Sequence, residues 1–338
     1  MMGRRGRVKS GGALGVIGSI RGFMSIVKEI NFDEVRERAE LSPRLLVLAD
    51  STENAEAVRN VVFGTDAAPA VDARNVDDGL REIVRYDAII VADSDRRGVV
   101  DRVRREIPGP ANESPVVAFT GTGTDDSAAV ERCRHDLAVR FPDLAPSLGR
   151  HIPALRPAAV KAIIDDAAKA NAQFALISNV PSVVPVVGSL VSASADLIVL
   201  TKNQVMMFYK IAAVHDRNLR DQFGIIREVV PVVGAGFFWR TVAREAASFI
   251  PLAAGTIPKV AIAYAGTVTA GRAADFYYRA GKKPTRAQVQ GFAAQASESI
   301  GRIPLPGRGD PRASTNGVES CAVSAELPAT SDGKTEGA

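Results

Sequence analysis

The chain has 338 residues, of which 46% are hydrophobic and 24% charged, with a formal net charge of +4. This length gives room for two domains with sizeable cores, and two cysteines exclude a disulfide framework and fit a reducing cytoplasm. The charge is uneven: Lys+Arg outnumber Asp+Glu by 6 to 1 in residues 1–30 and by 17 to 9 in residues 151–302, whereas residues 41–150 carry 14 against 19. Two basic parts around a neutral-to-acidic middle suit an anionic surface. The basic residues lie between apolar runs and form no aromatic-interleaved stripe, which disfavours nucleic acid as a partner.

Residues 1–40 predict a basic amphipathic N-terminal helix. Apolar residues recur at helical spacing behind a basic head, and no cleavage site typical of a secretory signal follows. Such a helix lies in a membrane interface, or alternatively packs on the protein's own body. The candidate membrane-contact residues are Arg4, Arg5, Arg7, Ile17, Ile20, Phe23, Met24 and Val27.

Residues 41–150 alternate short apolar runs with helical stretches. Strands are predicted at 44–50, 68–73, 87–93 and 115–120, and helices at 52–63, 77–85, 98–106 and 125–140. This alternation predicts a Rossmann-like α/β domain with a parallel sheet. Ligands of such sheets bind at the carboxyl ends of the strands, so the candidate ligand-binding residues are Asp50, Asp93 and Thr120.

The nucleotide motifs expected of such a domain are missing. The first strand–helix loop, Asp50 to Asn54, carries two carboxylates where a phosphate loop needs bare backbone N–H groups and a lysine. No lysine occurs between Lys28 and Lys161, which removes the phosphate-binding lysine, that of a guanine-reading motif and that of a receiver domain. The domain is therefore interpreted as degenerate, with no cofactor. Asp50 and Asp93 are interpreted as solvated acids that cap the next helices, with a Mg²⁺ site as the alternative.

Residues 151–302 predict a helical bundle with helices at 158–178, 186–215, from about 258 to 278, and 286–300. The stretch 170–195 has no charged residue, which approaches the length of a membrane span. The prolines at 181, 185, 251 and 258 shorten each helix, and charges at 196, 202, 210 and 259 would be costly in a bilayer. A soluble or surface-docked bundle is therefore favoured over integral spans.

Several smaller features of this region carry expectations. The sequence VVPVVG occurs at 183–188 and again at 229–234, which suggests two related helical hairpins. Ala263, Thr267 and Gly271 lie four apart, a spacing of small residues that favours close helix pairing. Residues 206–209 are interpreted as core, and His215 as a surface residue. From residue 303 the chain is rich in Pro, Gly, Ser and Thr and predicts a disordered tail.

The stretch Thr201–Ala213, with the apolar lead-in Pro185–Gly188 and the segments Ile257-Pro258 and Ala261–Tyr277, resembles a bacterial domain family of unknown function, DUF six-nine-seven. The resemblance covers about residues 160–280, and the family often follows a GTPase-like domain or occurs in YcjF-like inner-membrane proteins. The matched residues are Pro185, Gly188, Gln204, Met207, Ile211, Ala212, Pro258, Gly271 and Tyr277. The resemblance implies a GTPase-derived ancestry for residues 41–150 and membrane association, without a reaction.

These features together predict a non-catalytic accessory or scaffold protein at the cytoplasmic face of the inner membrane. Its expected partners are an anionic membrane surface and, through the helical region, another protein or a second copy of the chain. Two alternatives stay open at this point: a nucleotide- or metal-dependent hydrolase that uses the strand-end acids, and a channel or transporter component with broken helices.

Overall fold

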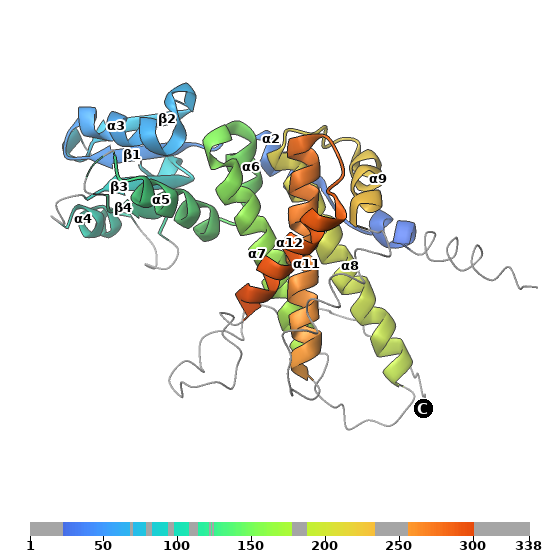
Figure 1. The fold of residues 1–338 in the computed structure, drawn as a ribbon. Helices are drawn as coiled ribbons and strands as arrows, with labels where there is room; N and C mark the ends of the chain where they lie inside the picture. The colour runs from blue at the N-terminus through green and yellow to red at the C-terminus, as the bar shows by residue number, and fades with distance from the viewer. Residues whose placement is uncertain are drawn as a thin grey trace, which may run out of the picture. The chain divides into compact units, whose positions relative to one another are not determined.

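The computed structural model describes residues 23–67, 70–78, 83–93, 98–107, 114–121, 123, 125–177, 188–233 and 256–300. Within these ranges, residues 177, 188–198, 256–259 and 300 are described by their backbone alone. Figure 1 shows a parallel sheet with its helices, followed along the chain by a region built from long helices.

The sheet contains four parallel strands, β1 (Leu45–Ala49), β2 (Val71–Asn75), β3 (Ala88–Ala92) and β4 (Val116–Phe119), in the order β2-β1-β3-β4. The order reverses between β1 and β3, because β2 lies on one side of β1 and the later strands lie on the other. Every residue of β1 is buried, as expected for a central parallel strand that is covered on both faces. The prediction of a mixed α/β fold with a parallel sheet is confirmed.

Alternate residues of β1 enter two different cores. Leu45 and Val47 pack with α3 (Thr52–Phe63) and α5 (Ser127–Arg140) on one face of the sheet. Leu46 and Leu48 pack with α4 (Val99–Glu106) on the other face. Because side chains alternate along a strand, the continuous apolar run from Leu45 to Ala49 requires helices on both faces.

The structure departs from the sequence predictions between β2 and β3. The second strand begins at Val71, three residues later than predicted, and the helix predicted at 77–85 is wrong over the described residues. Two 3₁₀ turns stand there instead, η2 (Val76–Asp78) and η3 (Ile83–Arg85). The Asn75 side chain accepts a hydrogen bond from the Asp77 backbone N–H at 2.9 Å, which offers the backbone a turn in place of an α-helix.

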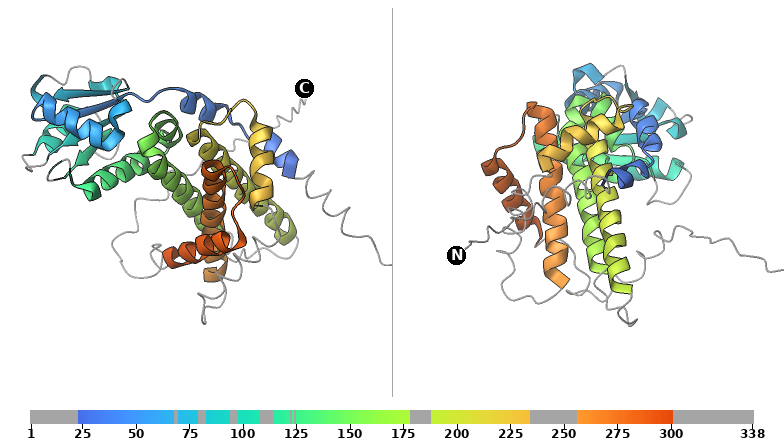
Figure 2. Two further views of the ribbon diagram at one scale, coloured as in Figure 1. Left: turned by 45° about the horizontal axis from the view of Figure 1, so that its top comes forward. Right: turned by 90° about the vertical axis from the view of Figure 1, so that its right-hand side faces the viewer.

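Three long helices form the centre of the helical region: α7 (Arg156–Ile177), α8 (Gly188–Val214) and α11 (Thr256–Ala280). Figures 1 and 2 show α12 (Arg286–Ile300) crossing α11, and α9 (Gln222–Val233) beside the upper part of α8. A Cβ atom added to Gly271 of α11 would lie 2.6 Å from Ile164 Cγ1 of α7, so glycine permits the close approach of these two helices. The helix pairing predicted from the small residues is confirmed at this position.

The chain also contains short elements that the sequence did not predict as separate elements. They are α2 (Asp33–Glu40), η1 (Thr65–Ala67), α6 (Ala145–His151) and η4 (Pro153–Leu155). Leu148 of α6 and Leu155 of η4 belong to the same buried cluster as Leu45 and Val47 of the sheet, and α6 also packs on α7 and α8. The boundary predicted near residue 150 therefore lies within shared packing.

The two copies of VVPVVG differ in what the structure describes. In the second copy, residues 229–233 form the end of α9, with Pro231 inside the helix, whereas residues 183–187 of the first copy lie outside the described residues. The interpretation as two related hairpins stays a prediction. The tail predicted from residue 303 also lies outside the described residues. Of the helices in the described part of the chain, none has the length and apolar character needed to cross a membrane.

Candidate functional site

The strand-end residues Asp50, Asp93 and Thr120 lie at one edge of the sheet, because β1, β3 and β4 are neighbours that run parallel. The Asp50 carboxylate accepts a hydrogen bond from Asn54 Nδ2 at 2.7 Å. The Asn54 backbone N–H donates to Ser51 Oγ at 3.1 Å, so Ser51 and not Asp50 caps helix α3. No group of three or more His, Cys, Asp or Glu side chains suited to a metal ion occurs among the residues that the structure describes.

The predicted membrane-contact residues divide between described and undescribed parts of the chain. Arg4, Arg5, Arg7, Ile17 and Ile20 lie outside the described residues. The helix over residues 23–28 is described, and its Val27 side chain is 1% exposed in a cluster with Tyr209 and Ile225. Phe23 packs against the same cluster, and Met24 is half-buried. Val27 therefore packs on the protein's own body, which is the alternative to membrane contact at this position.

Packing accounts for four of the nine residues that carry the family resemblance. Met207, Ile211 and Ala212 are at most 1% exposed, and Gly271 lies at the close approach of α7 and α11. The predicted core residues beside them, Phe208 and Tyr209, are also buried.

The other matched residues say less about packing. Gln204 and Tyr277 are half-buried. Gly188 and Pro258 are described by their backbone alone, and Pro185 lies outside the described residues.

The more developed site begins at the C-terminus of α8, where the chain turns immediately after His215. Asp216 has a left-handed backbone with φ 57°, a conformation that Asp tolerates better than most residues. The Arg217 backbone N–H donates to Ala212 O at 3.1 Å and the Asp216 N–H donates to Ala213 O at 3.0 Å. These two bonds form a Schellman motif, which fixes His215 as the last residue before the turn.

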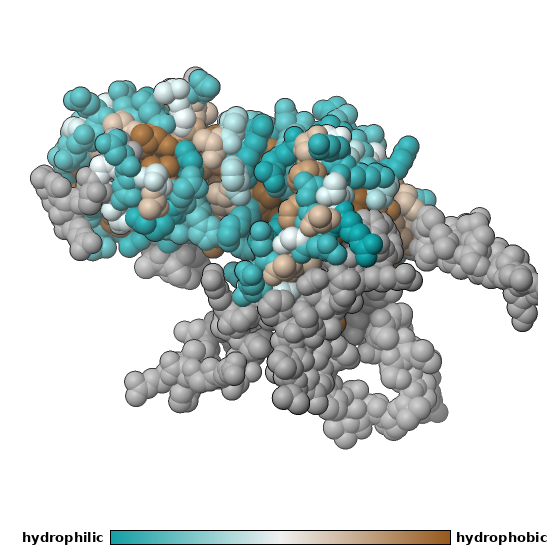
Figure 3. Space-filling model, in the orientation of Figure 1, coloured by the Kyte–Doolittle hydropathy of each residue, from teal (hydrophilic) through white to brown (hydrophobic). Residues whose placement is uncertain are grey.

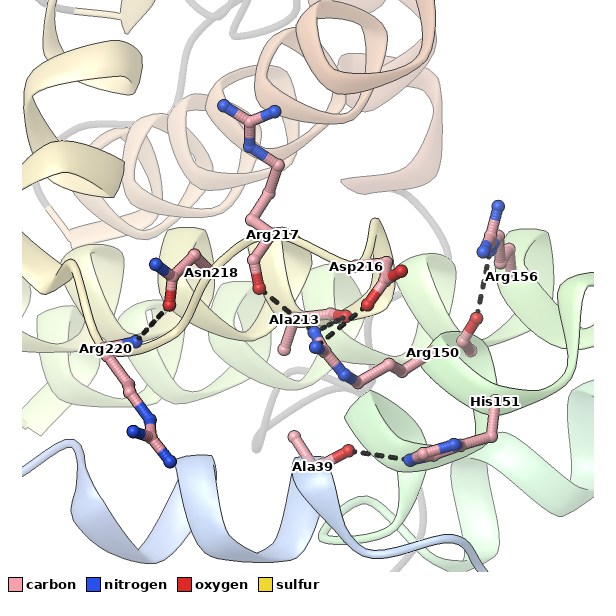
Figure 4. Close-up of polar contacts among 10 residues, drawn as sticks. Ala39, Arg150, His151, Arg156, Ala213, Asp216, Arg217, Asn218 and Arg220 are labelled. Atoms are coloured by element: carbon pink, nitrogen blue, oxygen red, sulfur yellow. Dashed lines mark hydrogen bonds and ion pairs between the residues drawn. The ribbon is translucent and has the colours of Figure 1, made fainter.

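Arg150 of α6 holds this turn from outside, as Figure 4 shows. Its guanidinium donates to Ala213 O at 3.4 Å and to Arg217 O at 3.1 Å, and it pairs with the Asp216 carboxylate at 2.8 Å. A cation here satisfies carbonyl groups that the end of an α-helix leaves unpaired and complements the negative end of the helix dipole. Arg150 thus ties the position of His215 to α6.

His215 lies against Asp275 of α11, and its side chain is only 8% exposed. Its Nε2 atom is 2.9 Å from Asp275 Oδ1, and Asp275 Oδ2 is 2.7 Å from Arg279 Nη2. An ionised carboxylate only accepts hydrogen bonds, so Nε2 of His215 carries the hydrogen. The prediction that His215 is a surface residue is wrong, because the turn after α8 directs it against α11 instead of into solvent.

Tyr278 completes this cluster. Its ring stacks on His215 with the ring centres 5.7 Å apart, and the Arg217 guanidinium lies 5.8 Å from the centre of the same ring. Burial raises the pKa of Tyr278 well above its ordinary value, and the nearby Glu228 carboxylate adds to the shift. The phenol therefore stays neutral, and its buried oxygen has no hydrogen-bond partner among the residues that the structure describes.

His215, Asp275, Tyr278 and Arg279 line an open cleft of about 700 Å³. The cleft is bounded by α7, by α11, by α12 and by the turn at His215. Its lining combines apolar and charged residues, namely Arg156, Pro157, Val160, Lys161, Ile164, Asp165, His215, Val268, Arg272, Asp275, Tyr278, Arg279, Phe292 and Gln295. A volume of this order is typical of clefts that hold small molecules.

Sequence patterns gave little indication of this cleft. Its charged residues lie on α7 and α11, more than 100 positions apart in the chain, and each one resembles a solvated residue on a helix face. The only local signal is the pair His215-Asp216 at the end of a long apolar helix. Tertiary packing of the helices brings the set together.

Comparisons with protein-family models, with curated proteins and with solved structures give no match for this chain. The resemblance to the domain family of unknown function therefore stays a prediction.

Proposed function

We propose that this protein is a non-catalytic accessory or scaffold that binds the anionic cytoplasmic face of the bacterial inner membrane through its N-terminal segment. The observation that carries the proposal is the basic amphipathic segment 1–30, whose final turns are attached to the helical region. Val27 is buried there, and the Glu29 carboxylate pairs with Lys202 of α8 at 3.1 Å. Binding of the segment to a surface would therefore bring the helical region with it.

A second amphipathic face lies beside this attachment. Helix α9 shares a buried cluster with Val27 through Ile225 and Ile226, and Figures 1 and 2 show the two helices side by side. On its outer side α9 exposes Phe223 and Val230, with the exposed Arg227 between them. These positions share one helix face, and apolar plus basic side chains are what an anionic bilayer interface binds.

The α/β region fits an accessory better than a hydrolase. We interpret it as a Rossmann-like domain that has lost its phosphate loop, with the reversal of strand order between β1 and β3 at the place where a ligand would bind. At that place the Asp50 carboxylate accepts a hydrogen bond from the Asn54 side chain, and the loop after β1 has no lysine. The helical region is the candidate surface for a protein partner.

Sedimentation with lipid vesicles tests the proposal. The full-length protein is expected to sediment with vesicles rich in phosphatidylglycerol and to remain in the supernatant with neutral phosphatidylcholine. Replacement of Arg4, Arg5 and Arg7 by Gln is expected to weaken binding about 100-fold, because each basic residue near an anionic surface contributes about 1 kcal/mol. Raised salt is expected to weaken it as well.

The variant Phe223→Ser tests the α9 face, and Val84→Ser is its matched control, since Val84 is an exposed apolar residue of the α/β region. Binding is expected to fall with Phe223→Ser and to be unchanged with Val84→Ser. If the full-length protein does not bind anionic vesicles at low salt, the proposal is wrong.

A further inference from the structure

The cleft beside His215 carries more positive than negative charge. Four cationic side chains, Arg156, Lys161, Arg272 and Arg279, line it with the carboxylates of Asp165 and Asp275. Four positive charges and two negative charges leave a formal net charge of +2, with His215 counted as neutral. Such a lining favours an anion.

Two of these cations are paired with carboxylates. Lys161 pairs with Asp165, and Arg279 pairs with Asp275. In contrast, Arg156 donates from Nε to the Gly149 backbone oxygen at 3.1 Å, as Figure 4 shows.

Arg272 likewise donates to a neutral oxygen, from Nη1 to Gln295 Oε1 at 2.6 Å. Each guanidinium has five N–H donors. Within the described part of the chain, Arg156 and Arg272 each form one side-chain hydrogen bond, which leaves further donors and a full positive charge for a ligand.

The remaining lining of the cleft is apolar. Val160 and Ile164 come from α7, Val268 from α11 and Phe292 from α12. Elsewhere, the molecular face shown in Figure 3 is largely hydrophilic over the described residues, with apolar side chains in small groups. Cationic and apolar side chains around one volume of about 700 Å³ therefore call for a ligand that has both characters.

We propose that this cleft binds an organic anion with an apolar body, a phosphate or carboxylate head on a hydrocarbon chain, with Arg156 and Arg272 as the residues that hold the head. The apolar side chains of α7, α11 and α12 contact the hydrocarbon. The proposal does not depend on membrane binding, because the cleft and the N-terminal segment are separate features.

Titration calorimetry on the full chain with three probes separates the two parts of the ligand. Octyl phosphate has the head and the chain, inorganic phosphate has only the head, and octanol has only the chain. Octyl phosphate, below its micelle concentration, is expected to bind at least about tenfold more tightly than either of the others. Equal affinity for octyl phosphate and octanol, or for octyl phosphate and inorganic phosphate, overturns the proposal, as does the absence of binding.

Variants of the two arginines test whether the ligand binds in the cleft. Arg156→Gln and Arg272→Gln are each expected to weaken octyl phosphate binding about tenfold or more and to leave octanol binding unchanged, since a hydrogen bond to a charged group contributes about 1.5–3 kcal/mol. Arg286→Gln is the matched control, because Arg286 is an exposed arginine of α12 that does not line the cleft.

Thermal unfolding of each variant, monitored by circular dichroism, shows whether the fold is retained. If a folded Arg156→Gln, Arg272→Gln double variant binds octyl phosphate as the unchanged protein does, the assignment is overturned. An effect of Arg286→Gln as large as that of Arg272→Gln also overturns it. Lipid-derived and free organic anions are then distinguished by comparing octyl phosphate with vesicles that contain the same head group.

Discussion

His215 Nε2 and Asp275 Oδ1 lie 2.9 Å apart although 60 positions separate the two residues in the chain. The contact joins the end of α8 to α11, and Arg279 binds the other oxygen of the same carboxylate at 2.7 Å. Asp275 is thus shared between a buried imidazole and a guanidinium at the edge of the cleft.

Replacement of Asp275 by Ala is expected to lower the free energy of unfolding by about 1–3 kcal/mol, because it leaves the buried His215 without its hydrogen-bond partner. Asp275→Asn retains an acceptor and is expected to cost less. Urea denaturation measures both. The control is Asp101→Ala, which removes an exposed ion pair with Arg104 at 3.8 Å and is expected to change stability by less than about 1 kcal/mol. Equal losses in Asp275→Ala and the control would contradict the structural role of the contact.

Gly271→Ala is expected to destabilise the protein by about 1–3 kcal/mol, since the new methyl group would overlap Ile164 and force α7 and α11 apart. The second change Ile164→Val is expected to restore part of the loss. Gly291→Ala in α12 is the matched control: nothing lies within 4 Å of a Cβ atom there, so alanine is expected to stabilise the helix by about 0.5–1 kcal/mol. Thermal denaturation distinguishes the two signs, and a stabilising effect at Gly271 would refute the close approach.

Arg150→Gln is expected to cost about 1–3 kcal/mol, because it removes donors to the Ala213 and Arg217 carbonyl groups and the pair with Asp216. Hydrogen exchange at the end of α8 is expected to accelerate, since the turn that positions His215 loses its external support. Arg38→Gln serves for comparison, as Arg38 forms an exposed pair with Asp143 at 3.0 Å. Unchanged exchange in Arg150→Gln would show that the backbone bonds alone hold the turn.

Burial raises the pKa of the Cys133 thiol from its ordinary value of 9.0 to about 12. The folded state therefore keeps the proton while the unfolded state releases it above about pH 9, so this contribution to stability is present below pH 9 and is lost as the pH rises toward 12. The slope approaches about 1.4 kcal/mol per pH unit within that window. Denaturation curves from pH 8 to 11 measure it, and Cys133→Ala is expected to reduce the slope.

A thiol reagent provides an independent measurement of the same thiol. In a Cys321→Ser background, Cys133 is expected to react only after unfolding, because its side chain is 1% exposed and the thiolate is the reactive form. Rapid reaction in the native protein at pH 8 would contradict its burial.

Local patterns determined much of the fold. The apolar run at 44–50 predicted a strand of a parallel sheet, and the structure has β1 there at Leu45–Ala49. The helices at 52–63, 99–106 and 127–140 also follow from periodicity, and their observed bounds lie within two residues of the prediction. The helix predicted at 77–85 was wrong over the described residues. At its start the Asp77 backbone N–H donates to the Asn75 side chain, which favours a turn over a helix.

The sequence by itself determined where the apolar strands and helices lie, and that the α/β region lacks a phosphate loop, since these depend on neighbouring residues. Only the tertiary structure decided that His215 packs against α11 and that the helices enclose a cleft. The side chains of the cleft come from three helices and from the turn at His215. Helix packing depends on contacts between residues far apart in the chain, such as Gly271 with Ile164. A charged residue on an isolated helix has the same pattern whether it faces solvent or a cleft, so the distinction arises only when the helices pack.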